Sequence, residues 1–238
     1  MPIPMSPEVM KRCLVAVPLL TSLSPADLDM LVSSARSVSF KKGARIFEEG
    51  SPADCCFVLT SGKVRVVLAG SGGAEILLNI LTPPALLGEM GLLEHPTRSA
   101  SLVAAEPCHL IRISGAAFQS LRSNRAFEDR LVAGLVSTVR RSDDRVRVIT
   151  SFPTEKRIAW CLGRVASVSG RREGSYIVLP KTPHQELAQM AGCTRETVSR
   201  ALQTLRKKKY VAVDSRTLRI DINAMQRYLT TELTVPER

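Results

Sequence analysis

Three residues at fixed distances constrain the fold of residues 184–206 more than any other feature of the chain. Ala188 is small, Gly192 follows it by four positions, and Val198 comes six positions later. Two helices cross closely only at a small side chain, a tight turn favours glycine, and a β-branched side chain can fill the space between them. The spacing therefore predicts two helices joined by a short turn, a helix-turn-helix.

The second of these helices carries side chains that suit a nucleic acid. Thr194 is placed to cap its first turn, and charged residues follow on the next two turns. In the major groove, arginine suits guanine and glutamate suits the amino group of cytosine. The alternative is an exposed charged helix in which Glu196 pairs with Arg200. The residues expected to contact double-stranded DNA are Thr194, Arg195, Glu196, Thr197, Ser199 and Arg200.

Basic residues concentrate in the C-terminal part of the chain. Residues 150–238 contain 16 lysines and arginines against 8 acidic residues, and so carry +8 of the net charge of +11. A clustered positive charge suits a polyphosphate partner, although a solvated basic face has the same composition. Charge alone leaves both interpretations open.

The composition indicates a cytoplasmic globular protein. Hydrophobic residues make up 45% of the chain, yet no apolar run approaches the roughly 18 residues that span a membrane, and we expect no membrane partner. The N-terminus has no pattern of a secretion signal. Six scattered cysteines, without a C-x-x-C pair or a histidine at zinc-finger spacing, favour reduced structural thiols and no metal site.

The first 117 residues predict a small β-domain with N-terminal helices. Residues 24–27, Ser-Pro-Ala-Asp, have the pattern of a helix start. Short apolar runs separated by glycines from about 38 to 113 predict an antiparallel barrel or roll. The runs 64–68 and 75–80 flank a pair of glycines as the strands of a hairpin do.

Residues 116–149 contain no proline and predict one long helix, which we assign as a central dimerisation helix over 118–152. Its apolar row has the three- and four-residue spacing of a coiled-coil seam and predicts a homodimer. The alternative is that the row packs only on its own domain. The row consists of Leu131, Leu135, Val139, Ser142, Val146 and Ile149.

Pro153 ends this helix, and residues 153–238 predict a winged helix-turn-helix domain. Thr154 is expected to cap a helix whose buried stripe is Ile158, Cys161, Leu162 and Val165. Residues 210–213 and 218–222 predict a β-hairpin, the wing. A further helix over 224–233 has no functional explanation.

Residues 86–102, LLGEMGLLEHPTRSASL, form the second informative stretch. A glycine lies next to an acid, and an Arg-Ser pair follows nine positions after that acid. Backbone amides and Arg98 suit a cyclic phosphate, while Glu89 can accept a hydrogen bond from a ribose hydroxyl. A buried structural ion pair between Glu89 and Arg98 explains the same residues.

In these motifs the chain resembles the cyclic-AMP receptor protein and FNR family of bacterial transcription regulators. The resemblance runs in order over residues 18–222 and is carried by PLLTSL (18–23), FKKG (40–43), IFEEG (46–50), VLTSG (58–62), the 86–102 stretch and TRETVSR (194–200). It implies an α+β fold: an N-terminal cyclic-nucleotide-binding β-roll of the jelly-roll type, a long dimerisation helix and a C-terminal winged helix-turn-helix.

The resemblance also implies a set of ligand contacts. Gly88 and Glu89, with Met90 beside them, would meet the ribose, Arg98 and Ser99 the cyclic phosphate, and Ser142 with Asp143 the purine. Cyclic AMP is the expected effector, with cyclic GMP and cyclic di-GMP as alternatives. The sequence lacks the cysteine cluster of iron-sulfur sensors, and no histidine or cysteine lies where a haem ligand is expected.

On the DNA side, Arg195, Glu196 and Arg200 match the cyclic-AMP receptor branch of the family, whereas Glu196, Ser199 and Arg200 match the FNR branch. Because Arg195 is present, the resemblance suggests a palindrome of TGTGA-like half-sites. RNA polymerase is an expected partner, and the loop 169–174 is a candidate contact by family position, with a solvated turn as the alternative. Whether the protein activates or represses transcription, and which genes it controls, stays open.

Three functions follow from the sequence. The first is a dimeric regulator gated by a cyclic nucleotide, and it includes no enzyme activity. The second is a regulator of the same build that needs no nucleotide, since Pro83-Pro84 and Leu86-Leu87 stand where the family often has a glycine and an aromatic residue. The third is a cyclic-nucleotide module that serves an enzyme, which the helix-turn-helix and the lack of a catalytic constellation disfavour.

Overall fold

The structure, a computed structural model, describes residues 5–73, 75–93, 97–214 and 217–230. The chain forms two compact units, Met1–Arg141 and Ser142–Arg238, and each is described by itself. No helix in the described ranges combines the length and the apolar character that crossing a bilayer requires. The six cysteine thiols are free.

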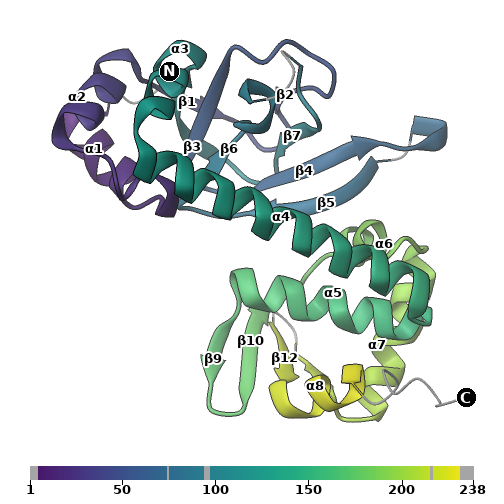
Figure 1. Cartoon of the computed structure of the whole chain (residues 1–238). Helices are drawn as coiled ribbons and strands as arrows, with labels where there is room; N and C mark the ends of the chain where they lie inside the picture. Colours follow the sequence, from purple (N-terminus) through teal and green to yellow (C-terminus); the bar gives the residue numbers. More distant parts are fainter. Residues whose placement is uncertain (1–4, 74, 94–96, 215–216, 231–238) are drawn as a thin grey trace, which may run out of the picture. The chain divides into compact units, whose positions relative to one another are not determined.

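The first unit begins with helices α1 (Pro7–Val15), η1 (Pro18–Leu20) and α2 (Pro25–Ser34) (Figure 1). The helix start predicted at 24–27 is confirmed: the Ser24 hydroxyl accepts from the Asp27 amide at 3.1 Å, and the Asp27 carboxylate accepts from the Ser24 amide at 3.2 Å. Helix α1, which the sequence did not single out, starts after Ser6, whose hydroxyl accepts from the Val9 amide at 3.4 Å.

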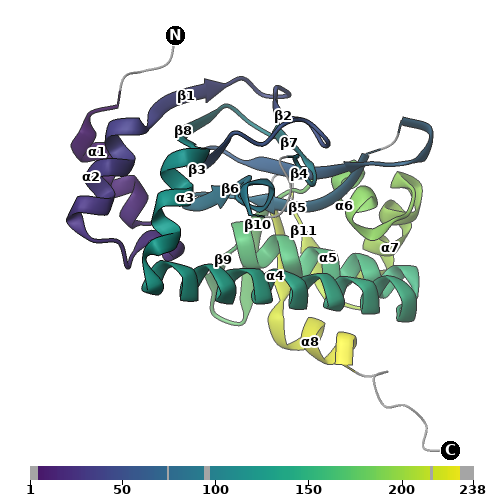
Figure 2. The same ribbon diagram turned by 45° about the horizontal axis from the view of Figure 1, so that its top comes forward.

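Two four-stranded antiparallel sheets follow and confirm the predicted roll (Figure 2). Their orders are β1-β8-β3-β6 and β2-β7-β4-β5. The predicted hairpin is β4 with β5, joined through η2 (Ser71–Gly73), where Gly72 has a φ of 65°. The strands are β1 (Arg36–Phe40), β2 (Arg45–Phe47), β3 (Cys55–Ser61), β4 (Val64–Ala69), β5 (Glu75–Leu81), β6 (Ala85–Leu87), β7 (Ser101–Ala104) and β8 (Cys108–Ser114).

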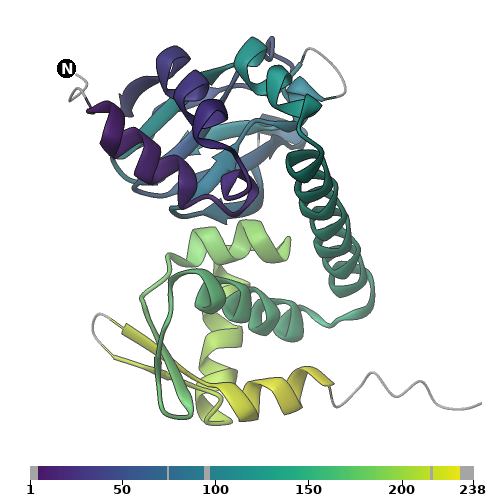
Figure 3. The same cartoon turned by 60° about the vertical axis from the view of Figure 1, so that its left-hand side comes forward.

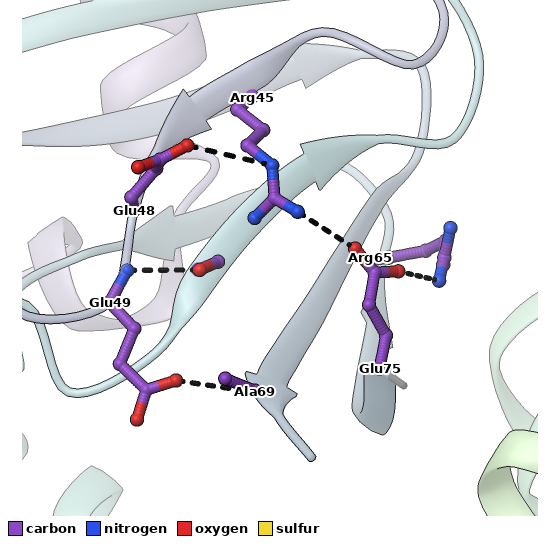
Figure 4. A network of polar contacts seen from close by, with 7 residues as sticks. Arg45, Glu48, Glu49, Arg65, Ala69 and Glu75 are labelled. Atoms are coloured by element: carbon purple, nitrogen blue, oxygen red, sulfur yellow. Dashed lines mark hydrogen bonds and ion pairs between the residues drawn. The ribbon is translucent and has the colours of Figure 1, made fainter. Parts of the chain in front are cut away.

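Charged side chains fasten the β4–β5 hairpin to the rest of its sheet (Figure 4). The Glu75 carboxylate accepts from Arg45 on β2 at 3.1 Å and from Arg65 on β4 at 2.7 Å. The Glu49 carboxylate, in the segment after β2, accepts from the amide of Ala69 at 3.0 Å. These bonds tie the turn end of the hairpin to β2 and to the segment that follows β2.

The long helix predicted from Ala116 is interrupted, and that prediction is wrong at its start. The structure has α3 (Gly115–Ser120), η4 (Leu121–Ser123) and α4 (Arg125–Ser151), so the central helix begins at Arg125 and not at residue 118. Asn124 is extended, and its side-chain oxygen accepts from the Phe127 amide at 3.2 Å, as a capping residue does. Phe118 and Phe127, both buried, pack edge to face across this break.

Helix α4, the long teal helix in Figure 3, carries two apolar rows rather than one. Leu131 and Leu135 pack on the core of the roll, so the first part of the predicted row faces its own domain. The exposed row begins one position later, and it keeps the last apolar members of the prediction. It comprises Val132, Val136, Val139, Val146 and Ile149.

The second unit contains α5 (Thr154–Ser169), β9 (Arg171–Glu173), β10 (Tyr176–Pro180), α6 (His184–Ala191), α7 (Arg195–Lys207), β11 (Val211–Val213), β12 (Thr217–Asp221) and α8 (Ile222–Thr230). The strands form one antiparallel sheet in the order β11-β12-β10-β9. The predicted wing is confirmed as β11 paired with β12, while its tip, 215–216, lies outside the described residues.

Three details of the second unit differ from the sequence reading. Pro153, and not Thr154, is the N-cap of α5, although the predicted stripe of that helix is buried. The expected loop 169–174 contains strand β9, because residues 171–173 pair with β10. Helix α8 begins at Ile222, two positions earlier than predicted, and residues 231–233 lie outside the described residues.

Candidate DNA-reading helix and ligand pocket

The helix-turn-helix register predicted from Ala188, Gly192 and Val198 is confirmed. Helix α6 ends at Gly192, whose φ of 62° lies in the left-handed region that glycine adopts without strain. The amide of Cys193 donates to the carbonyl of Ala188 at 3.1 Å and closes the turn. Ala188 is 2% exposed and Val198 is fully buried between the helices.

Helix α7 presents a charged surface at its first two turns. Thr194 is its N-cap, and its hydroxyl accepts from the Thr197 amide at 3.3 Å. Thr194, Arg195, Glu196 and Arg200 are exposed. Among the described ion pairs none joins Glu196 to Arg200, and Arg200 instead donates to the Thr197 hydroxyl at 3.3 Å. The guanidinium of Arg195 and the carboxylate of Glu196 therefore face solvent.

Thr197 and Ser199 are half-buried and their hydroxyl groups already have partners within the protein. The Ser199 hydroxyl lies 2.8 Å from Nδ1 of His184 at the start of α6, and 3.1 Å from the carbonyl of Arg195. Ser199 thus joins α6 to α7, a role that the sequence reading missed. His184 lies 15 positions away, and no short motif connects the two residues.

The link between His184 and Ser199 predicts a pH dependence of stability. Burial, then the charges of Arg195 and Lys181, lowers the pKa of His184 below its ordinary value of 6.5. The unfolded chain therefore takes up the proton first, so the free energy of unfolding falls as the pH drops below about 6.5. Urea titrations between pH 5 and 8 should show a smaller pH slope for His184→Gln. Equal slopes would contradict this prediction.

Arg98 is a buried arginine in the segment of the roll that precedes β7. It is 4% exposed, and its guanidinium donates to the carbonyl of Gly88 at 2.9 Å and to the sulfur of Cys55 at 3.3 Å. Asp54 lies 3.9 Å from the same guanidinium and 2.7 Å from that of Arg112. A hydrogen bond with Cys55, followed by the charge of Arg112, lowers the pKa of Asp54.

Three further features describe the surroundings of Arg98 and fit it to an anion. Its Nε atom is buried and has no hydrogen-bond partner in the structure, although a buried donor without a partner is costly. Gly88 has a φ of 78°, and a Cβ atom there would lie 2.8 Å from the guanidinium and 3.0 Å from the ring of Phe47. Phe47 covers the guanidinium at 4.1 Å from its ring centroid. The donor set suits a phosphate.

The structure brings some of the predicted ligand residues together and leaves others apart. Glu89 adjoins Gly88, and burial raises the pKa of its carboxyl. No ion pair among the described residues joins Glu89 to Arg98, so the structure lacks that alternative pairing. Met90 is 42% exposed in η3 (Met90–Leu92), and Ser99 is exposed. Residues 94–96 of the same stretch lie outside the described residues.

A cavity of about 610 Å³ lies beside Glu89, between η1, β6 and α4. Its volume is in the range of small-molecule sites. Leu86 and Leu135 line its apolar part, and Thr138 and Arg141 line its polar part. Ser142 and Asp143 are exposed on the part of α4 that belongs to the second unit, and their contact with a purine stays a prediction.

Comparison with known proteins finds a matching domain family for each of the two units. Residues 37–125 match the model of the cyclic nucleotide-binding domain, and residues 156–228 match that of the Crp-like helix-turn-helix domain. The cyclic AMP receptor protein of Thermus thermophilus is 31% identical over 204 residues, which are 85% of this chain and 92% of that protein. The chain belongs to the CRP/FNR family of transcription regulators. As such a regulator it is not an enzyme.

Solved structures of other regulators share the fold of this CRP-family regulator. A mutant of CooA from Carboxydothermus hydrogenoformans gives a TM-score of 0.71 at 23% identity, covering 88% of this chain and 92% of that one. The c-di-GMP-responsive regulator CLP of Xanthomonas campestris gives 0.68 at 20% identity, covering 83% and 99%. The predicted fold class is therefore confirmed.

Proposed function

We propose that this regulator binds DNA as a homodimer, and that a cyclic nucleotide in the β-roll controls its affinity. The observation that carries the nucleotide part is the buried Arg98, whose Nε donor lacks a protein partner beside the side-chain-free Gly88. Arg98 and Ser99 would hold the cyclic phosphate and Glu89 the ribose. The cyclic phosphate would accept a hydrogen bond from the buried Nε donor of Arg98, and its negative charge would balance the guanidinium.

Cyclic AMP is the first candidate effector, because a relative from Thermus thermophilus that is 31% identical to this chain is a cyclic AMP receptor protein. Cyclic GMP and cyclic di-GMP are the alternatives, the latter named for the regulator CLP. Ser142 and Asp143 would contact the purine from α4. The alternative is a regulator of the same build that binds DNA without a nucleotide. We also propose that the regulator contacts RNA polymerase and acts in the cytoplasm.

The homodimer is supported by the exposed row of α4. Val132, Val136 and Val139 recur at intervals of four and three residues, and Val146 and Ile149 continue at seven and three. This is the spacing by which two helices pair along an apolar seam. A symmetric dimer would present two α7 helices to half-sites about one helical turn apart.

The proposed target is a palindrome of TGTGA-like half-sites, read by Arg195, Glu196 and Arg200. Fluorescence anisotropy with a labelled palindrome, with and without cyclic AMP, cyclic GMP and cyclic di-GMP, tests both parts of the proposal. Tighter DNA binding with one nucleotide is expected. No response to any of them would favour the nucleotide-independent regulator, and equal affinity for a single half-site would count against the dimer.

Arg195→Ala should lower the affinity for the palindrome by about 5- to 150-fold and relax the preference at one base position, as loss of a bidentate base contact does. Arg206→Ala, an exposed arginine in the last turn of α7, is the matched control. It should at most weaken binding to every sequence alike. Uniform weakening by Arg195→Ala as well would refute the base contact.

A further inference from the structure

The part of α4 in the second unit has two distinct sides. Val146 and Ile149 are exposed, whereas Val148 is 6% exposed and Arg145 is half-buried. Positions 145 and 148 are one helical turn apart and share a face. In this stretch Arg145 and Val148 are therefore covered by the protein, whereas Val146 and Ile149 are left exposed.

Helix α4 is joined to the helix-turn-helix by a polar contact. The buried apolar core of the second unit is built from residues 158–225, and among the described residues it takes no side chain from α4. Arg145 nevertheless reaches α6, where its guanidinium donates to the carbonyl of Met190 at 3.4 Å. A contact to the backbone of α6 is thus made by a helix that stays outside the core.

The carbonyl of Met190 lies next to the turn that joins α6 to α7. It belongs to the last turn of α6, where carbonyl groups have no partner within the helix. The Ala188 carbonyl accepts from the backbone amides of Gly192 and Cys193, which form the turn. A cation at a helix C-terminus is favoured by the helix dipole. Burial lowers the pKa of Arg145, so a desolvated guanidinium meets a carbonyl that needs a donor.

We propose that Arg145 is a positioning residue, through which α4 holds the turn between α6 and α7. The turn precedes Thr194 and Arg195, so its position sets the angle at which α7 leaves α6. Ser142 and Asp143, the proposed purine contacts, lie within one turn of Arg145 on the same helix. The regulatory part of this inference rests on the proposed function: a ligand that shifts α4 would shift the carbonyl of Met190 with it.

Hydrogen exchange of the full-length protein, without nucleotide or DNA, tests the contact itself. Arg145→Gln should speed exchange of the amides of residues 191–193 by about tenfold, as loss of a charged hydrogen bond does. Arg145→Lys, which keeps a donor and the charge, should restore part of the protection. Arg147→Gln, an exposed arginine on the same helix, is the control and should leave exchange unchanged. Parental exchange in Arg145→Gln would overturn the proposal.

DNA anisotropy with and without cyclic AMP tests the regulatory part. A merely structural role would weaken binding equally in both conditions. We expect Arg145→Gln to reduce the ratio of the two affinities by about 2- to 30-fold, and Arg145→Lys to recover it. An unchanged ratio would refute the coupling. If the parent protein ignores nucleotides, the proposed function fails, and the exchange measurement still decides the role of Arg145.

Discussion

Replacement of Arg98 by leucine will lower the affinity for a cyclic nucleotide by about 100-fold or more. The leucine leaves the cyclic phosphate without its buried cation, and an unpaired buried charge is more costly than the loss of one contact. Arg98 also holds the carbonyl of Gly88, so the loop at 88–90 will lose one of its supports. Calorimetric titration with cyclic AMP measures the effect, and circular dichroism monitors the fold.

Arg112→Leu is the matched control for this experiment. Arg112 shares the Asp54 carboxylate with Arg98, yet its side chain is 37% exposed and it was not assigned to the ligand. The nucleotide affinity of Arg112→Leu should stay near that of the parent protein. Arg98→Lys keeps a positive charge without the planar fork, and should bind with intermediate affinity. Parental affinity in Arg98→Leu would remove the basis for a phosphate at this position.

Glutamate at both Val139 and Val146 will separate the dimer and lower the affinity for the palindrome by about 100-fold or more. Val139 and Val146 belong to the exposed row of α4, and their side chains are 60% and 61% exposed in the single chain. Charges facing each other across a paired helix seam are repelled and desolvated. Binding of the palindrome then loses the advantage of two linked half-sites, which is worth about 100- to 10,000-fold.

Sedimentation velocity gives the oligomeric state of this double variant, and anisotropy gives its DNA affinity. Val168→Glu is the control, because Val168 is an exposed valine of α5 outside the row. It should leave both measurements unchanged. A double variant that stays dimeric would place the interface elsewhere on the chain.

The parts of the structure that were predictable from sequence depend on short-range patterns. Ala188, Gly192 and Val198 lie within eleven residues, and each must satisfy a packing or backbone requirement of one turn, so their spacing was sufficient. The cap at Ser24 and the hairpin through Gly72 are equally local. Each of these was confirmed, and each depends on residues that are close together in the sequence.

The contacts that the sequence did not predict join distant segments. Arg98 meets Cys55 and Phe47 only because β2, β3 and β6 come together in the roll, and no spacing encodes that meeting. Ser199 was assigned to DNA from its position on α7, but its side chain is shared with His184 from α6. A local sequence pattern predicts which side of a helix a residue occupies, but it does not predict which distant residue contacts that side.

The break at Asn124 shows the same limit within one helix. The absence of proline from 116 to 149 suggested continuity, and Asn124 was not identified as a capping residue from the sequence. Beyond the break, the first two leucines of the predicted row face the roll. A periodicity of three and four cannot distinguish that inward row from the exposed row one position along.

The adjacency of Leu131, which is buried in the roll, and Val132, which is exposed, has a thermodynamic consequence. If the valine row pairs with a second copy, one rigid helix serves two interfaces, and it cannot rotate to improve one without disturbing the other. Association of two chains and the melting of each β-roll then become linked equilibria. By mass action, the heat resistance of the roll would depend on protein concentration, although its own core is complete within one chain.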